Sequence, residues 1–262
     1  MNIAIVGATG NVGRKTLEVL EKKDLSIDNL YLLASSKSVG KKINFKDVEH
    51  EIHDLDSFDF SNVKICFFAA GGKISEKFAT KAAKNCLVID NSSHFRMDPD
   101  VPLIVPQVNS DDLKNIKKNI VANPNCSTAQ LVIALKPLHD LFSIKRIVVS
   151  TYQSVSGGGK APMDELIEQT KLVLDGKKVK SKNFTKQIAF NAIPQIDIFS
   201  DNGYTKEELK MANETKKILD NKIDLTATCV RLPISVSHSE SVNIQFEKPF
   251  SIEKVREALE NF

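Results

Sequence analysis

The sequence predicts an α/β protein with a parallel sheet in its first half and a mixed or antiparallel sheet in its second half. In the first half, short and continuously apolar segments alternate with segments of helical length, which is typical of βαβ units. In the second half, apolar and polar residues alternate over longer segments, which is typical of strands covered by helices on one face. We therefore expect two domains, residues 1–125 and residues 126–262.

The first domain is predicted to begin with a strand and a helix and to repeat this alternation. Predicted strands cover residues 2–7, 29–35, 63–70 and 86–92, and predicted helices cover residues 11–22 and 74–85. In the first of these helices, Val12, Leu17, Val19 and Leu20 give one apolar face. Helices that connect successive buried strands imply that the strands run parallel.

The second domain is predicted to begin with a helix at Cys126, because Leu131, Leu135 and Leu138 recur at roughly helical spacing. Long β-rich segments follow over residues 144–156 and 227–249, and helices over residues 161–174 and 205–220, with a polar stretch at 175–186 between the helices. These elements predict an α+β domain.

The overall composition is that of a globular protein and excludes several classes. Of the 262 residues, 42% are hydrophobic and 26% charged, and the formal net charge of +3 comes from scattered lysines, which gives no case for nucleic acid or an acidic membrane. The four cysteines lie far apart without metal-ligand spacing, so neither zinc nor a disulfide framework is expected. The chain opens on a strand rather than a leader and has no run long enough to span a bilayer, so we expect a cytoplasmic protein.

A glycine-rich loop follows the first predicted strand and opens the first helix. Gly7, Gly10 and Gly13 form a G-x-x-G-x-x-G pattern, a variant of the dinucleotide fingerprint. Such glycines allow a tight turn and let a pyrophosphate approach the N-terminus of a helix. At this position the pattern favours a dinucleotide site over a merely structural turn.

The end of the second strand indicates which dinucleotide is bound. An NAD site usually has a carboxylate there for the ribose 2′-hydroxyl. This chain instead has Ser35, Ser36, Lys37 and Ser38, whose hydroxyls and ammonium suit a 2′-phosphate. The sequence therefore predicts NADP(H), although a solvated loop lysine is the alternative reading.

Cys126 lies where a strand and a Pro-containing turn give way to a helix, and we expect Ser127 and Thr128 to cap that helix. Unpaired N–H groups and the positive end of the helix dipole favour a thiolate over a thiol. The alternative is a buried and inert cysteine, the more common case for a free thiol.

Two other segments are unusual for a plain scaffold. The segment "TYQSVSGGGKAP" places Gln153 at a strand end before three glycines, and "CVRLPISVSHSESV" carries Arg231 and His238. In an unbroken strand, His238 would share the core face with Val230 and Val242. A structural and a catalytic histidine are both compatible with this pattern.

Together these segments resemble the aspartate-β-semialdehyde dehydrogenase family. The motifs "GATGNVG", "LLASSKS", "NSSHFRM", "NPNCST", "TYQSVSGGG", "NETKKIL" and "CVRLP…HSE" occur in the family's order over essentially the whole chain. The resemblance implies a Rossmann-type NADP-binding domain and a catalytic and dimerisation domain of α+β type, like that of glyceraldehyde-3-phosphate dehydrogenase. It also implies a homodimer and a place in the biosynthesis of lysine through diaminopimelate, methionine and threonine.

The reaction that the resemblance implies is the reversible, NADPH-dependent reductive dephosphorylation of aspartyl-4-phosphate to aspartate-4-semialdehyde. Hydride leaves readily from a tetrahedral thiohemiacetal, so the chemistry needs a nucleophile, a base and cations for two anions. By resemblance, Cys126 is the nucleophile that forms an acyl-thioester, His238 the acid/base and Gln153 the residue that positions the thioacyl group.

The remaining site residues are also carried over from the family's motifs. The substrate residues are Arg231 for the α-carboxylate, Glu214 for the amine, and Arg96, Asn125 and Lys217 for the phosphate. The cofactor contacts are Gly7, Thr9, Gly10, Asn11, Val12, Gly13, Ser36, Lys37, Ser38, Ser156 and Gly157. No metal is implied.

The sequence departs from the family's pattern in two places. The family continues beyond Phe262 with a segment that returns to the cofactor domain and supplies a contact near the nicotinamide, and the sequence ends before it. Ser237 stands before His238, where glycine is frequent in the family.

Two alternative functions stay open at this point. N-acetyl-γ-glutamyl-phosphate reductase uses the same acyl-thioester chemistry, but its cysteine motif usually reads G-C-Y-P-T, and its acetylated substrate has no amine for Glu214. A non-catalytic NADP-sensing protein would share the glycine loop but has no use for converging Cys, Gln, Arg and His side chains.

Overall fold

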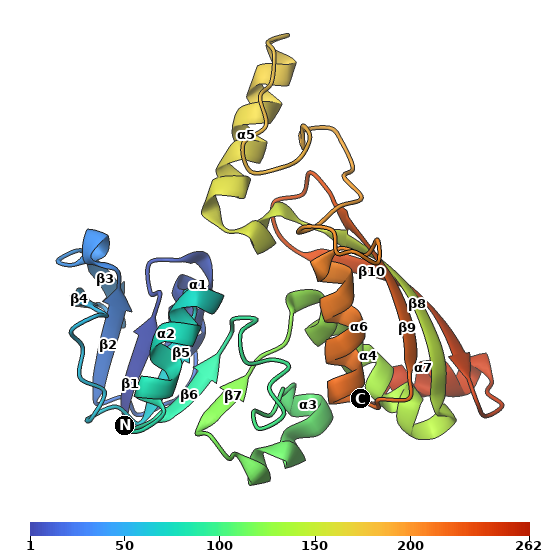
Figure 1. Cartoon of the computed structure of the whole chain (residues 1–262), viewed down its shortest axis with the longest axis horizontal. Helices are drawn as coiled ribbons and strands as arrows, with labels where there is room; N and C mark the ends of the chain where they lie inside the picture. The colour runs from blue at the N-terminus through green and yellow to red at the C-terminus, as the bar shows by residue number, and fades with distance from the viewer. The chain divides into compact units, whose positions relative to one another are not determined.

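The computed structural model describes residues 1–262 and divides into two compact units, Met1–Pro124 and Asn125–Phe262 (Figure 1). Each unit has its own sheet and its own hydrophobic core. None of the helices combines the length and the apolar character needed to cross a lipid bilayer.

The first unit is built on a seven-stranded sheet in the order β3-β4-β2-β1-β5-β6-β7. Its strands are β1 (Asn2–Val6), β2 (Asn29–Ala34), β3 (Lys42–Phe45), β4 (Val48–Asp54), β5 (Ile65–Phe68), β6 (Leu87–Asp90) and β7 (Ile120–Ala122). All neighbours pair parallel except β3 and β4. The strand order reverses at β1, as in doubly wound dinucleotide-binding folds, so the predicted Rossmann-type architecture is confirmed.

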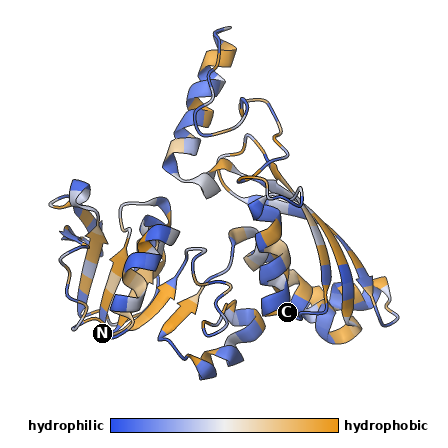
Figure 2. Cartoon of the chain, viewed as in Figure 1, coloured by the Kyte–Doolittle hydropathy of each residue, from blue (hydrophilic) through white to orange (hydrophobic).

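The central strands are mostly apolar (Figure 2); β1 is buried beyond Asn2, whereas β5 and β6 alternate between buried and partly buried residues. Ile3, Ile5 and Leu32 form the core together with Leu17 and Leu20. The last two belong to α1 (Asn11–Glu21), and α2 (Gly72–Ala82) packs against β5 and β6. Short helical turns complete this unit: η1 (Ser36–Ser38), α3 (Pro106–Asn109) and η2 (Ser110–Asn115).

The second unit is built on a three-stranded mixed sheet in the order β10-β8-β9. The central strand β8 (Ile144–Gln153) pairs parallel with β9 (Asp224–Arg231) and antiparallel with β10 (His238–Phe246). The helices are α4 (Cys126–Phe142), α5 (Lys160–Leu174), α6 (Lys206–Ile218) and α7 (Ile252–Glu260), with a short turn η3 (Val155–Gly158) after β8. The predicted α+β arrangement is confirmed.

Helices α4 and α6 cover one face of this sheet. Leu131 and Leu135 of α4 and Met211 of α6 pack against Ile147 and Val149 of β8. The opposite face carries more exposed residues, including Tyr152 of β8, Thr228 of β9 and Ser239 of β10. Within this chain, helices α4 and α6 therefore cover one face of the sheet and leave the other face exposed.

The β-rich segment 227–249 is not one strand, so His238 shares the helix-covered face of the sheet with Val242, as predicted, but not with Val230. β9 ends at Arg231 and β10 begins at His238, on the opposite side of β8. Pro233 lies in the break and has no N–H for a ladder, and Ser237 has a φ of 85°, outside the β region. His238 thus does not share a strand with Val230.

This break has a direct consequence for the site. In the register of the sheet, Gln153 at the end of β8 pairs with Arg231 on one side and with His238 on the other. Three residues from separate sequence motifs therefore meet at one end of the sheet.

Candidate active site

Cys126 is the first residue of α4, and Asn125 is its N-cap. The Asn125 side-chain oxygen accepts hydrogen bonds from the Ser127 N–H at 2.9 Å and the Thr128 N–H at 3.4 Å. The expectation that Ser127 and Thr128 cap the helix is therefore wrong: both lie in its first turn, and their buried hydroxyl oxygens have no hydrogen-bond partner in the structure. The cap fixes the backbone that carries Cys126.

Cys126 is exposed, and its Sγ lies 3.2 Å from His238 Nε2. The other ring nitrogen of His238, Nδ1, accepts a hydrogen bond from the Ser154 N–H at 3.0 Å and lies 3.3 Å from the Ser154 Oγ. When Nδ1 accepts, the neutral ring carries its proton on Nε2 and can donate it to the sulfur. Burial, joined by the Arg231 charge, lowers the pKa of His238 despite the opposing effects of the Ser237 backbone and Glu207.

Gln153 is buried at the end of β8 with both ends of its carboxamide bonded. Its Oε1 accepts from the Thr151 hydroxyl at 2.9 Å, and its Nε2 donates to Glu207 Oε1 at 3.0 Å. An amide held at both ends presents a fixed donor direction, as a residue that positions a substrate requires.

Arg231 ends β9, and its Nη1 donates to the Ser154 carbonyl at 2.5 Å. Burial lowers the pKa of this guanidinium, although arginine stays charged at neutral pH. A Cβ built on Gly157 would lie 3.4 Å from Arg231 Nη1 and 3.7 Å from His238 Nε2. Gly157 thus lies against both side chains, and Ser156 beside it bonds the Ser154 hydroxyl at 2.9 Å.

Glu214 and Lys217 lie one turn apart on α6. The Glu214 carboxylate is buried and accepts the Asn125 backbone N–H at 2.6 Å, which ties α6 to the start of α4. Lys217 is half-buried. Hydrogen bonds and strand pairing thus link six predicted site residues within the second unit: Cys126, His238, Gln153, Arg231, Asn125 and Glu214.

The predicted cofactor loop forms the β1–α1 connection of the first unit. Gly7 has a φ of +86°, and a Cβ on Gly13 would lie 2.3 Å from the Gly7 carbonyl oxygen, so both positions require glycine. No side chain caps α1 and no acidic residue lies in its first turn. The helix start with Thr9, Gly10, Asn11 and Val12 therefore fits a pyrophosphate.

The predicted 2′-phosphate residues Ser36, Lys37 and Ser38 form η1, directly after β2. η1 contains no acidic residue. Elsewhere in the first unit, Arg96 is 8% exposed, and its guanidinium is held by the Asn123 carbonyl at 2.9 Å and the Asn91 carbonyl at 3.0 Å.

Comparison with known proteins assigns this arrangement to a family. A semialdehyde dehydrogenase NAD-binding domain model matches residues 2–116, and a semialdehyde dehydrogenase dimerisation domain model matches residues 135–262. Aspartate-semialdehyde dehydrogenase from Aquifex aeolicus is 52% identical over 99% of this chain and 78% of its own length. The chain belongs to the aspartate-semialdehyde dehydrogenase family. These relatives favour this family over the two alternatives that the sequence left open.

Solved structures of the aspartate-semialdehyde dehydrogenase family share the fold over the whole chain. Aspartate semialdehyde dehydrogenase II from Vibrio cholerae superposes with a TM-score of 0.97 at 49% identity, over 99% of this chain and 78% of that one. A probable aspartate-semialdehyde dehydrogenase from Pseudomonas aeruginosa gives a TM-score of 0.94 at 30% identity, over 100% of this chain and 79% of that one.

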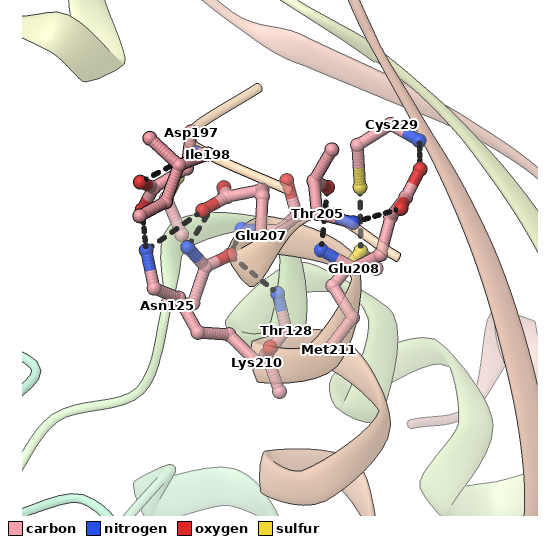
Figure 3. Close-up of polar contacts among 12 residues, drawn as sticks. Asn125, Thr128, Asp197, Ile198, Thr205, Glu207, Glu208, Lys210, Met211 and Cys229 are labelled. Atoms are coloured by element: carbon pink, nitrogen blue, oxygen red, sulfur yellow. Dashed lines mark hydrogen bonds and ion pairs between the residues drawn. The ribbon is translucent and has the colours of Figure 1, made fainter. Parts of the chain in front are cut away.

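The structure adds one side chain to the site of this aspartate-semialdehyde dehydrogenase family member that the sequence did not indicate. Glu207 bonds both Gln153 and Asn125 and is 6% exposed; Figure 3 shows it beside Asn125. In the sequence, Glu207 and Glu208 follow Thr205 and resemble ordinary acidic residues of a helix start. Glu208 indeed forms the capping box with Thr205, and nothing in the pattern separates the two glutamates.

Proposed function

We propose that this protein interconverts L-aspartyl-4-phosphate and L-aspartate-4-semialdehyde plus phosphate through an acyl-thioester on Cys126, with NADP(H) as cofactor. The observation that carries the proposal is the 3.2 Å contact between Cys126 Sγ and His238 Nε2 at the start of a helix, beside Gln153 and Arg231. We assign cofactor binding to residues 1–125 and catalysis to residues 126–262.

The first step of aldehyde oxidation is attack of the Cys126 sulfur on the aldehyde carbon, which forms a thiohemiacetal. An Nε2–H on His238 holds the attacking thiolate and then the new oxygen by hydrogen bonding. The Ser154 backbone N–H points at Nδ1 and so favours the neutral ring with its proton on Nε2. In this tautomer His238 donates at Nε2, and proton acceptance there would need the Ser154 N–H to turn away from Nδ1.

The cofactor fits the first unit through Gly7, Gly13 and the uncapped start of α1, with Lys37 of η1 for the 2′-phosphate. When bound there, the cofactor would supply the hydride acceptor for oxidation of the thiohemiacetal and the hydride donor for the reverse direction. Phosphate then displaces the Cys126 sulfur from the thioester and releases the acyl phosphate.

We assign the two anions of the substrate to different cations. Arg231 uses an Nη1 donor for the Ser154 carbonyl, and a guanidinium with five N–H groups retains a planar pair for the α-carboxylate. Lys217 and Arg96 are assigned to phosphate, together with Asn125. Glu214 is assigned to the substrate amine, since a buried carboxylate next to Asn125 is an acceptor for an ammonium.

The assembly and location of the protein are further proposals. The sheet face with Tyr152, Thr228 and Ser239 is exposed within the chain and belongs to the segment that matches a dimerisation domain, which supports a homodimer. All four cysteines are free thiols, which supports a reducing, cytoplasmic setting.

The test is an assay of NADPH formation from aspartate semialdehyde and NADP⁺. We expect activity that requires phosphate and is abolished in Cys126→Ala. Under the assignment of the anions, Arg231→Lys raises KM for the semialdehyde and lowers kcat, whereas Lys217→Ala raises KM chiefly for phosphate. Activity that persists in Cys126→Ala contradicts the thioester, and unchanged phosphate kinetics in Lys217→Ala contradict the assignment of the anions.

A further inference from the structure

Glu207 lies in the first turn of α6, and its carboxylate meets the carboxamides of Asn125 and Gln153; Figure 3 shows Glu207 beside Asn125. Its Oε1 accepts from Asn125 Nδ2 at 2.9 Å and from Gln153 Nε2 at 3.0 Å. A single oxygen atom therefore joins the N-cap of the helix that carries Cys126 to the residue that ends β8.

Each of these amides is committed at its other end as well. The Asn125 oxygen caps α4 through the Ser127 and Thr128 N–H groups, and the Gln153 oxygen accepts from the Thr151 hydroxyl. A carboxylate has no donor, so only the NH₂ ends of the two amides can face Glu207. The network thus allows one orientation of each amide and excludes the flipped one.

The charge of Glu207 is balanced inside the same network. Lys210 Nζ lies 3.2 Å from Glu207 Oε2 and 3.0 Å from Asp197 Oδ2. Burial acts to raise the pKa of Glu207, but the Lys210 charge and the bonds from Gln153 and Asn125 outweigh it and hold the pKa below its ordinary value. Burial likewise acts to lower the pKa of Lys210, and the two carboxylates raise it above its ordinary value.

We propose that Glu207 is a positioning residue of the reaction, which orients the Gln153 amide toward the acyl group and holds Asn125, and so Cys126, in place. This inference rests on the proposed function, in which Gln153 donates to the thioacyl oxygen. One N–H of the Gln153 amide is used by Glu207, and the second is the donor for the substrate. Gln153 pairs with His238 in the sheet, so this donor lies next to the Cys126–His238 pair.

The first test compares Glu207→Gln with Glu208→Gln. Glu208 is a matched control because it is buried in the same helical turn and its carboxylate accepts from backbone groups, the N–H groups of Thr205 and Cys229. In Glu207→Gln, the new side-chain NH₂ must face either the Lys210 ammonium or the NH₂ groups of Asn125 and Gln153. Each of these groups is itself a donor, so one of the former contacts is lost. We expect kcat to fall by about 10-fold to 100-fold with a smaller change in KM, because the acyl group is misplaced. We expect Glu208→Gln to lower the melting temperature with kcat changed by less than about twofold.

A double variant separates positioning from general destabilisation. If Glu207 acts through Gln153, Glu207→Gln loses most of its effect on kcat in a Gln153→Ala background. The change Lys210→Met removes the ammonium that competes for the new amide oxygen, so Glu207→Gln/Lys210→Met should recover part of the lost kcat. Additive effects of Glu207→Gln and Gln153→Ala, or equal kcat values in Glu207→Gln and Glu208→Gln, overturn the proposal.

A readout independent of turnover distinguishes failure of this inference from failure of the proposed function. The side-chain amide NMR signals of Gln153 and Asn125, assigned by their loss in the Ala variants, should exchange slowly in the wild type and faster in Glu207→Gln, but not in Glu208→Gln. Unchanged exchange in Glu207→Gln overturns the positioning role. A wild type that shows this exchange pattern without phosphate-dependent activity retains the contact network and overturns the proposed function, and with it the role of that network in the reaction.

Discussion

The four cysteines of this chain differ sharply in burial, and this predicts their chemistry. Cys126 is exposed, whereas Cys66, Cys86 and Cys229 are buried. Burial raises the pKa of Cys66 well above its ordinary value and raises the pKa of Cys229 to about 12. We expect iodoacetamide to alkylate Cys126 faster than the other three, and substrate to protect it. Peptide mass spectrometry after timed labelling measures this, and equal rates at all four sites would count against the nucleophile.

Ser237 adopts a backbone conformation that suits glycine better than serine. Its φ is 85°, and it directly precedes His238. A non-glycine residue at such a φ costs on the order of 1 kcal/mol, partly offset by the extra freedom that glycine has in the unfolded chain. We expect Ser237→Gly to leave the free energy of unfolding equal or raise it by up to about 1 kcal/mol, with kcat retained. Urea denaturation measures this, and a loss above 1 kcal/mol would show that the serine side chain supports the site.

At the scale of elements, a second contact joins α4 and β10, about one helical turn along α4 from the Cys126–His238 contact. Gln130 Nε2 donates to Glu240 Oε1 at 2.8 Å. Burial raises the pKa of Glu240 to about 7, although the Gln130 bond opposes the shift. The folded protein therefore keeps this proton over a range in which the unfolded chain, with a pKa near 4.3, has lost it.

This shift makes the stability of the fold depend on pH in a defined direction. Between about pH 4.3 and pH 7 the folded state binds more protons than the unfolded state at Glu240, so its contribution to stability falls as pH rises. Allowing for partial exposure, the loss is on the order of 1 to 2 kcal/mol. Glu240→Gln keeps the acceptor for Gln130 and removes the titration. The difference in free energy of unfolding between the two proteins, measured from pH 5 to pH 8, should therefore change steadily up to about pH 7, whereas a constant difference contradicts the raised pKa.

The elements that the sequence predicted are those whose burial pattern is unambiguous. β1, β5 and β6 consist mainly of apolar residues that are buried or partly buried. The hairpin β3–β4 was not predicted, because of the eleven residues in its two strands only Phe45 and Ile52 are buried. Its turn needs positive φ at Lys46 and Asp47, neither of which is glycine.

The site was predictable in part for a similar reason. Four site residues lie in motifs whose composition is unusual for a purely structural segment: Cys126, Gln153, Arg231 and His238. They can therefore be recognised as candidates from the single sequence. Glu207 was missed because its helix start resembles an ordinary capping box. Only the folded structure distinguishes Glu207, which accepts from two side-chain amides, from its neighbour Glu208, which accepts from backbone N–H groups.

At the scale of the whole molecule, the two units carry separate parts of the proposed reaction. The glycine loop and Lys37 belong to Met1–Pro124, whereas Cys126, His238 and Gln153 belong to Asn125–Phe262. Each unit has its own core, so a surface substitution in one should leave the local geometry of the other unchanged.

This separation predicts a reciprocal pair of variants. Lys37→Ala removes a cation from η1, so NADPH binding should weaken by about 1 to 3 kcal/mol with little change for NADH, and the alkylation rate of Cys126 should stay at its wild-type value. Cys126→Ala should abolish turnover and leave NADPH affinity nearly unchanged. Lys41→Ala is the matched control, because Lys41 is an exposed lysine just beyond η1. Fluorescence titration with both dinucleotides measures the affinities. Equal weakening by Lys37→Ala and Lys41→Ala would show a general effect of charge, and equal wild-type affinity for NADPH and NADH would contradict the assignment of Lys37 to the 2′-phosphate.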